Sequence, residues 1–192
     1  MERKSIVDIC VMCYWGRVDD GMLETAIKTF RKVNKTALLY VYTDGGAIPL
    51  NSDCDVNWFP VAKKQVEGRR ALCKIELLDK LMRLAFEDDR IIASDIDVYF
   101  LKDPFKAFDE FFDLGVTTRC HSFQCPINAG MFFMLNNENM RDFMTYRLAE
   151  ISPHVTGVSG DWGVDQAFLN KVWSQKAEMT ERFGIIIKDV GP

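Results

Sequence analysis

The chain has 192 residues, of which 48% are hydrophobic and 27% charged, and its net charge is −4. These values are typical of one globular domain with a real core, and they lack the basic surplus that duplex nucleic acid requires. No apolar run approaches the roughly 20 residues that span a bilayer, and residues 1–5 do not resemble a signal peptide. We therefore expect no nucleic-acid partner and no membrane span.

Strand and helix signals alternate along the chain. Buried strands are expected in seven segments: residues 5–13, 37–42, 56–59, 90–94, 114–117, 129–135 and 184–187. Helices are expected in five segments: residues 21–33, 70–86, 106–112, 137–150 and 164–173. The first helix has apolar residues at helical spacing, behind the candidate caps Asp19 and Asp20: Met22, Ala26, Phe30 and Val33. The second has a longer stripe: Leu72, Ile75, Leu78, Leu81, Met82 and Ala85.

This alternation predicts an α/β fold, a single domain over residues 1–192 with a mostly parallel central sheet flanked by helices. In such sheets ligands bind beyond the carboxyl ends of the strands. Tyr14 and Trp15, Asp44, and the segment from Asp95 to Asp97 each follow an expected strand. The ligand site is therefore expected where these three segments meet.

Six cysteines raise the question of a metal or redox site. Cys10 and Cys13 are spaced as C-x-x-C, but they fall in a strand-like run, where residues three apart point to opposite faces. Cys120 and Cys125 flank His121 but complete no second pair, so the spacing disfavours zinc. Unpaired thiols without a secretion signal favour a reducing, cytoplasmic location.

Two carboxylates, Asp95 and Asp97, follow the buried strand at residues 90–94. On an extended backbone, side chains two residues apart project to the same side. Close carboxylates resist ionisation unless a cation joins them, and Mn²⁺ or Mg²⁺ could be shared with the oxygens of a diphosphate. A solvated loop cap is the alternative, but apolar residues and then Asp103-Pro104 follow the pair. The sequence thus predicts a metal site.

Residues 91–105 resemble the metal-binding strand of the GT-A (Rossmann-like) glycosyltransferases, and more narrowly the retaining nucleotide-diphospho-sugar transferases of glycosyltransferase families 8 and 77. Two further motifs occur in the family's order. Asn128-Ala129-Gly130 is similar to the family's strand that lines the donor-sugar pocket. Asp161-Trp162 with Asp165-Gln166 is similar to the family's Asp-Gln helix start, which a Leu-Asn pair follows. The resemblance spans roughly residues 5 to 173, and three ordered motifs are more specific than one.

The resemblance implies a UDP-sugar donor, a carbohydrate or glycoconjugate acceptor and a Mn²⁺ or Mg²⁺ cofactor held by Asp95 and Asp97. Ser94 and the backbone around Ile96 would lie near the ribose and diphosphate. Around the nucleotide, Asp44 would accept from the base, Tyr14 or Trp15 would stack on it, and Arg70 and Lys74 would neutralise the diphosphate. Ordinary loop packing for the aromatic residues and a solvated helix face for the basic ones are the alternatives.

The same resemblance places Asn128, Ala129, Gly130, Asp161 and Trp162 around the donor sugar or acceptor. Asp165 and Gln166 would be catalytic, Asp165 on the sugar and Gln166 near the anomeric carbon. The alternatives are that Asp165 and Gln166 simply cap their helix, that Asn128 is a turn residue, and that Trp162 fills the edge of the core. Retention of configuration is implied, by double displacement or by front-side attack.

One departure from the family concerns the third metal ligand. Many family 8 members end in a His-x-x-Gly-x-x-Lys-Pro segment, which this sequence lacks, and its histidines are His121 and His154 alone. The third ligand could be water, either histidine or a residue lost by truncation.

Two rival functions also remain: a sugar nucleotidyltransferase, disfavoured by a first loop with one glycine, and a non-catalytic binding module on the same fold.

Overall fold

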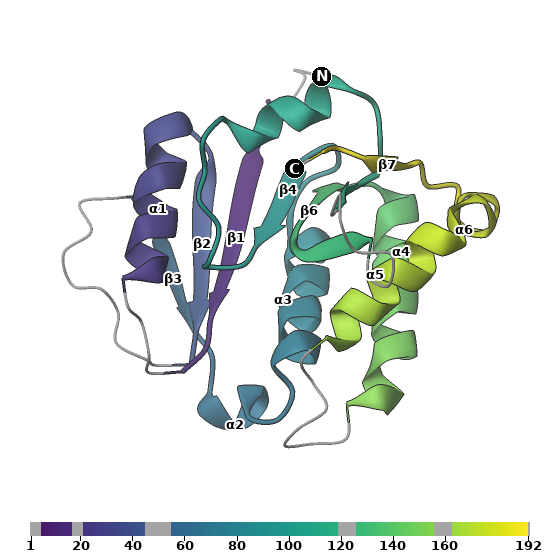
Figure 1. Ribbon diagram of the computed structural model, residues 1–192, viewed down its shortest axis with the longest axis horizontal. Helices are drawn as coiled ribbons and strands as arrows, with labels where there is room; N and C mark the ends of the chain where they lie inside the picture. The colour runs from purple at the N-terminus through teal and green to yellow at the C-terminus, as the bar shows by residue number, and fades with distance from the viewer. Residues whose placement is uncertain (1–4, 17–20, 45–54, 119–125, 156–162, 192) are drawn as a thin grey trace.

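The computed structural model describes residues 5–16, 21–44, 55–118, 126–155 and 163–191, which build one sheet flanked by helices (Figure 1). Seven strands form within this part of the chain: β1 (Asp8–Tyr14), β2 (Leu38–Thr43), β3 (Asn57–Pro60), β4 (Arg90–Ser94), β5 (Leu114–Thr118), β6 (Ile127–Leu135) and β7 (Ile187–Asp189). Their order across the sheet is β3-β2-β1-β4-β6-β5-β7, so that β3 and β7 are the edges.

All neighbouring strands are parallel except at β6, which runs antiparallel to both β4 and β5. The predicted α/β domain with a mostly parallel sheet is therefore confirmed. The reversal at β6 has a direct consequence for function. Because β6 runs antiparallel to β4, its amino end lies beside the carboxyl end of β4. This is the end of the sheet at which ligands bind in such folds.

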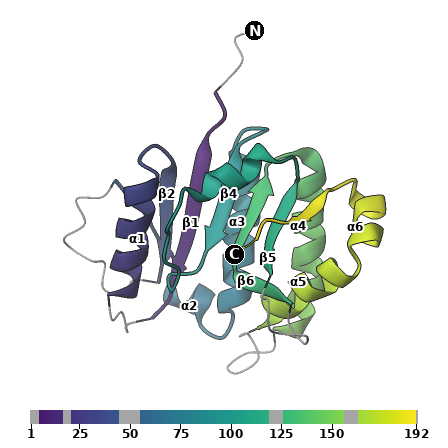
Figure 2. The same cartoon turned by 45° about the horizontal axis from the view of Figure 1, so that its top comes forward.

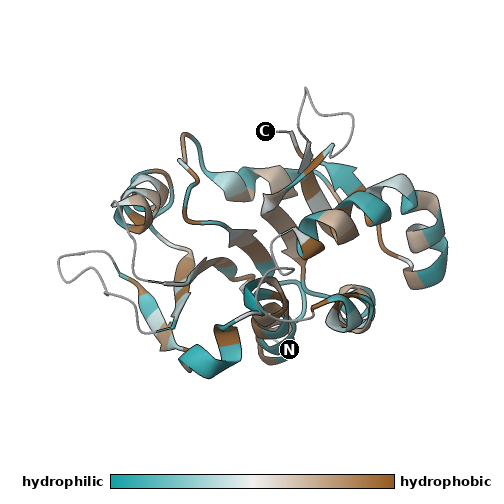
Figure 3. Ribbon diagram, turned by 60° about the horizontal axis from the view of Figure 1, so that its bottom comes forward, coloured by the Kyte–Doolittle hydropathy of each residue, from teal (hydrophilic) through white to brown (hydrophobic). Residues whose placement is uncertain are grey.

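The described helices are α1 (Met22–Val33), α2 (Lys63–Val66), α3 (Arg70–Leu84), α4 (Glu138–Ile151), α5 (Val164–Ser174) and α6 (Lys176–Phe183), with 3₁₀ turns η1 (Pro104–Asp109) and η2 (Ser152–His154). The helices alternate hydrophilic and hydrophobic residues (Figure 3), as elements with one buried face do. No helix in these ranges is long and apolar enough to cross a membrane.

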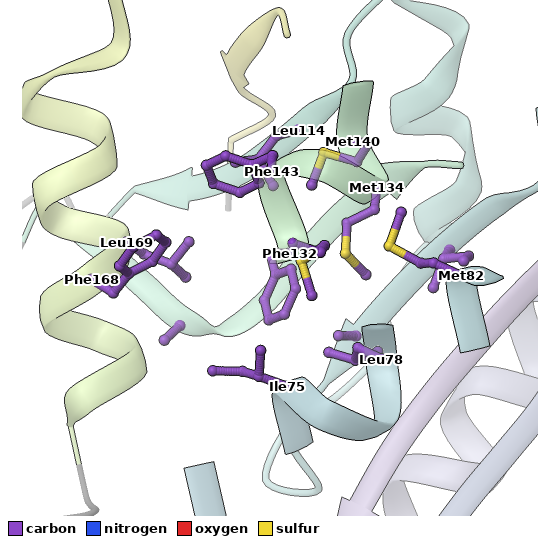
Figure 4. Close-up of a cluster of buried hydrophobic side chains, with 14 of the residues drawn as sticks. Ile75, Leu78, Met82, Leu114, Phe132, Met134, Met140, Phe143, Phe168 and Leu169 are labelled. Atoms are coloured by element: carbon purple, nitrogen blue, oxygen red, sulfur yellow. The ribbon is translucent and has the colours of Figure 1, made fainter. Parts of the chain in front are cut away.

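Two hydrophobic cores cover the two faces of the sheet. One lies under α3, α4, α5 and α6 and is centred on Phe132 of β6 (Figure 4). The other lies under α1 and η1, and Figure 2 shows α1 well apart from α4, α5 and α6. Along β1, Cys10 belongs to the α1 core and Cys13 packs against the α3 core. The predicted opposite orientation of these two cysteines is confirmed, so they cannot chelate one metal ion.

The predicted stripe of α3 is confirmed from Leu72 to Met82, but Ala85 lies just beyond the end of the helix. The predicted stripe of α1 is partly wrong. In α1, Leu23, Ala26, Ile27 and Phe30 are fully buried, but Met22 at the first helical position is 40% exposed. A terminal residue has no preceding turn to fix its direction against the core. The expected caps Asp19 and Asp20 lie outside the described residues, and the observed N-cap is Gly21 in a left-handed conformation.

The C-terminal elements also differ from the prediction. Helix α6 was not expected, because Met179 is its only fully buried residue and, with the half-buried Phe183, it gives too short an apolar pattern for a periodic stripe. It ends at Gly184, whose φ of 68° is the left-handed conformation that commonly terminates a helix. The last strand therefore begins at Ile187 and not at Gly184.

Asp113, at the start of β5, joins three elements and is expected to be important for stability. It is 4% exposed, and its carboxylate accepts hydrogen bonds from the Asn137 side chain and, at 2.7 Å, from the Ile186 N–H. In Asp113→Asn, the amide NH₂ group would replace one of the two accepting oxygens and would face a donor. This should cost about 1–3 kcal/mol in the free energy of unfolding. Urea unfolding measures this cost. The same change at the exposed Asp109 should cost less than about 0.5 kcal/mol.

Candidate functional site

The carboxyl ends of β1, β2 and β4 lie side by side at one end of the strands of the sheet. Tyr14 pairs with Thr43 in β2, and Met12 pairs with Ser94 in β4, so the loops that follow these strands start side by side. The Asp44 carboxylate accepts the Gly16 N–H at 3.1 Å, which connects the first two loops. Arg70 opens α3 beside them, since a Cβ built on Gly16 would lie 4.0 Å from Arg70 Nη2.

Lys74 on α3 joins two carboxylates that are far apart in the sequence. Its ammonium donates to Asp95 Oδ1 at 2.7 Å and lies 3.9 Å from Asp165 Oδ2. The Lys74 side chain is only 8% exposed and Asp165 13%, whereas Asp95, at 47%, faces solvent. The sequence prediction assigned Asp95 to the metal, Lys74 to the diphosphate and Asp165 to the donor sugar, and the structure brings the three side chains together. The Lys74 ammonium faces both carboxylates here.

Burial and charge both shift the pKa values of Lys74 and Asp95. Burial alone lowers the pKa of Lys74, but Asp95 and Asp165 outweigh burial, and the net pKa is raised. Burial also raises the pKa of Asp95; Lys74 opposes that rise, and Asp165 and Asp97 add to it. The rise at Asp95 is therefore due first to burial, and the rise at Lys74 is due to its two carboxylate neighbours.

We had expected Asp97 to follow Asp95 on an extended backbone, but it does not. Ile96 and Asp97 form a turn directly after β4, with Ile96 packed against the α1 core and Asp97 exposed. The turn carries Asp97 away from the strand direction. No group of three or more His, Cys, Asp or Glu residues close enough to hold a metal ion is found in the described segments. The two aspartates would therefore need other ligands, such as diphosphate oxygens, to complete a metal site.

The amino end of β6 brings the second motif to the same place. The Gly130 C=O accepts the Asp95 N–H at 2.7 Å, so β6 and the acidic segment are directly hydrogen-bonded. A Cβ on Gly130 would lie 3.2 Å from Asn128 Oδ1, closer than side chains usually pack, and would touch Asp95 Oδ2 at 3.4 Å. Gly130 therefore keeps open the space between an amide and a carboxylate.

The third motif lies on α5, across from this end of β6. Gln166 donates from Nε2 to the Ile127 C=O, and its Oε1 accepts the Ala129 N–H at 2.8 Å. Asn170, one turn later, accepts the Ile127 N–H at 3.0 Å. Asn170 was not among the predicted site residues, although the trailing Leu-Asn of the motif marked it. Asp161 and Trp162 lie outside the described residues.

Two predicted nucleotide contacts lie inside the protein. The Tyr14 side chain is 1% exposed in the core under α1, where its ring has no face open for a base; Trp15, partly buried against the α3 core, is closer to the surface. Ser94 is also 1% exposed and donates to the Asp95 C=O at 2.9 Å. It therefore shapes the acidic turn from within.

Arg147 on α4 is a buried cation that no sequence pattern indicated. It is fully buried, and its guanidinium nitrogens have no hydrogen-bond partner within the described residues. The guanidinium lies 4.7 Å from the centre of the Phe132 ring and 5.7 Å from that of Phe168. Burial lowers its pKa to about 10, and the charge of Asp165 opposes this. Arg147 thus adds a second positive charge behind Asp165.

Comparisons with known proteins support the fold. No protein-family model matches the chain, and no curated protein matches it in sequence. Two solved structures of the glycosyltransferase GlyE from Streptococcus pneumoniae TIGR4 are similar: one with a TM-score of 0.55 and 13% identity, the other, the apo form, with 0.56 and 14%. Each alignment covers 96% of this chain and 54% of the solved chain. The chain therefore has the fold seen in this glycosyltransferase and spans about half its length.

Proposed function

We propose that this chain forms the catalytic domain of a metal-dependent glycosyltransferase, moving a hexose or pentose from a UDP-sugar to a hydroxyl acceptor on a carbohydrate or glycoconjugate. One observation carries the proposal. Asp95 from the end of β4 and Asp165 from the start of α5 both face the buried Lys74, beside Gly130 at the carboxyl edge of the sheet. The likeness of the fold to a glycosyltransferase supports it.

The residues present fit a divalent cation, Mn²⁺ or Mg²⁺. Asp95 and Asp97 are hard oxygen ligands, both reach solvent, and Asp165 places a third carboxylate beside Lys74. Such a cation, when bound with the donor, supplies Lewis-acid stabilisation of the leaving diphosphate. Asp95 and Asp97 would hold it, and the diphosphate would provide further oxygen ligands.

The other residues divide the donor between them. Trp15 and Asp44 would contact the base, and Arg70, at the amino end of α3, would contact the diphosphate. Asn128, Gly130 and Asp165 would surround the sugar, with the Lys74 ammonium between Asp165 and Asp95. Retention of configuration by front-side attack suits this arrangement, because the leaving diphosphate can accept the proton of the acceptor hydroxyl and no strong protein base is required. The cytoplasmic location stays a prediction.

The proposal is tested first by calorimetric titration of UDP in Mn²⁺ and in chelator, and then by release of UDP from a panel of UDP-sugars. We expect UDP to bind at least about 10-fold more tightly with Mn²⁺. We also expect one UDP-sugar to be hydrolysed faster than the rest. Metal-dependent binding without turnover of any donor would favour the non-catalytic module. Equal binding in chelator would rule out the metal assignment.

Replacing Gly130 with Ala should lower turnover of the preferred UDP-sugar by about 10- to 100-fold with little change in stability, because the new methyl group fills the space between Asn128 and Asp95. Gly115→Ala is the matched control. There a Cβ would lie 2.9 Å from both Phe112 and Val190, so overpacking should cost about 1–3 kcal/mol of unfolding free energy. Urea unfolding and UDP release separate the two effects. Equal stability losses in both variants would contradict the assignment of Gly130 to the site.

A further inference from the structure

The amino end of β6 extends past its neighbour β4. Strand β4 ends at Ser94, which pairs with Met131, so residues 127–130 have no β4 residue within the ladder beside them. A strand without a neighbour leaves its N–H and C=O groups to find other partners, and an unpaired buried group costs about 1–3 kcal/mol. Ile127 is fully buried and Ala129 is 6% exposed, so their backbone groups need partners.

Side chains provide every one of these partners. Ile127 donates its N–H to Asn170 and accepts at its C=O from Gln166. Ala129 donates its N–H to Gln166 at 2.8 Å, and its C=O lies 3.5 Å from the Lys74 ammonium. The Gln166 amide thus binds the backbone on both sides of Asn128, as a peptide group of an adjacent strand would.

The same residues form a break in the pairing with β5. Val116 pairs with Phe132, but the next residue, Thr117, pairs with Asn128, so residues 129–131 of β6 are extra and form a bulge. The Thr117 hydroxyl lies 3.3 Å from the C=O groups of both Asn128 and Met131 and spans the bulge from the β5 side. The opposite side of the bulge is held by Gln166.

We infer that Gln166 is a positioning residue that holds the β6 bulge, and that it is not the nucleophile of a double displacement. The bulge presents Gly130, whose C=O accepts the Asp95 N–H, and Asn128, whose Oδ1 accepts the Gly130 N–H at 3.1 Å. Fixing Ala129 therefore fixes both the acidic segment and the amide beside it. The consequence for catalysis rests on the glycosyltransferase function proposed above, whereas the hydrogen-bonding role stands without it.

The geometry opposes a nucleophilic role. To approach a donor sugar, the Gln166 oxygen would have to leave the Ala129 N–H, and its nitrogen would have to leave the Ile127 C=O. Two buried backbone groups would then lose their partners at the moment of reaction. Asp165, the preceding residue, makes no such backbone bonds within the described chain and instead faces Lys74. Asp165 is thus the α5 side chain placed to meet a sugar.

Amide hydrogen exchange, followed by NMR on the ligand-free protein, tests the positioning role independently of any activity. In Gln166→Met, the Ala129 amide should exchange at least about 10-fold faster, and so should Gly130 if the bulge loosens as a whole. Gln65→Met, the same change in α2 away from β6, should leave both rates unchanged. An Ala129 rate equal to that of the wild type would overturn the inference. If Gln166→Met does not fold, Gln166→Asn, whose amide is one methylene too short to reach β6, replaces it: exchange of the Ala129 amide must then rise, and an unchanged rate again overturns the inference.

Turnover decides between positioning and nucleophilic roles. For the preferred UDP-sugar, Gln166→Met and Gln166→Glu should both lose about 10- to 100-fold in kcat, with KM within about 3-fold of the wild type. No glycosyl adduct should be seen by intact-protein mass spectrometry. A Gln166→Glu variant that keeps wild-type turnover, or that accumulates a glycosyl adduct, would overturn the inference. A chain that turns over no donor would refute the proposed function but leave the exchange result intact.

Discussion

Asp95→Asn should lower Mn²⁺-dependent turnover of the preferred UDP-sugar by about 10²- to 10³-fold. The change keeps the shape of the side chain but removes the charge that faces Lys74 at 2.7 Å and that we assign to the cation. UDP release at saturating donor measures the loss. Calorimetry with UDP should show, in parallel, that the difference between Mn²⁺ and chelator shrinks.

Asp109→Asn, an identical change at an exposed residue of η1, should leave turnover within a factor of about 2. Far-ultraviolet circular dichroism will show whether the Asp95 variant is folded, so that unfolding is not taken for a catalytic defect. If Asp95→Asn keeps wild-type turnover in Mn²⁺, Asp95 does not belong to the proposed catalytic site. The fold would then be the only support for a transferase function.

Lys74→Met should be the most destabilising single change in the site, by about 3 kcal/mol in the free energy of unfolding near neutral pH. The ammonium is 8% exposed and is the cation between Asp95 and Asp165. Methionine fills a similar volume but leaves those carboxylates facing each other. Urea unfolding measures the loss. Lys171→Met, which breaks the exposed pair with Glu150 on the protein surface, should cost much less than Lys74→Met.

The loss in Lys74→Met should depend on pH in a defined direction. In the wild type the raised pKa of Lys74 means that its stabilising charge is present below its unfolded pKa and lost only at strongly alkaline pH. In the variant, Asp95 loses the group that opposed the rise of its pKa. A carboxylate with a raised folded pKa is destabilising above that pKa, and the cost disappears as it protonates. The deficit should therefore be larger at about pH 8 than at about pH 4.5. A constant deficit would indicate lost packing alone.

The sequence predicted the sheet and the residues that gather at its carboxyl edge. Long apolar runs and a strong stripe such as that of α3 are local signals, and they were sufficient for most strands and helices but not for α6. The acidic segment, the Asn-Ala-Gly strand and the start of α5 were recognised by order and spacing, and Asp95, Lys74, Gly130 and Asp165 do lie together.

Other features of the site depend on contacts that are not local in the sequence. The turn at Ile96 follows from where β4 ends against β6, and nothing in the letters Asp-Ile-Asp indicates it. The role of Gln166 depends on a three-residue bulge in β6, which becomes visible only when the register with β5 is known. The buried Arg147 looked like an ordinary polar residue of an amphipathic helix, because burial of a charge is decided by the rings packed around it.

Strands β3 and β7, the two edges of the sheet, limit how this protein can associate with others. They are four and three residues long, and β3 ends at Pro60, which has no N–H to donate. Edge strands are the usual points at which a second chain or an extended peptide adds to a sheet, and short or proline-containing edges suppress such addition. An added strand would gain only a few main-chain hydrogen bonds at either edge. Self-association of this domain by sheet extension, the route to many aggregates, is therefore disfavoured by its architecture.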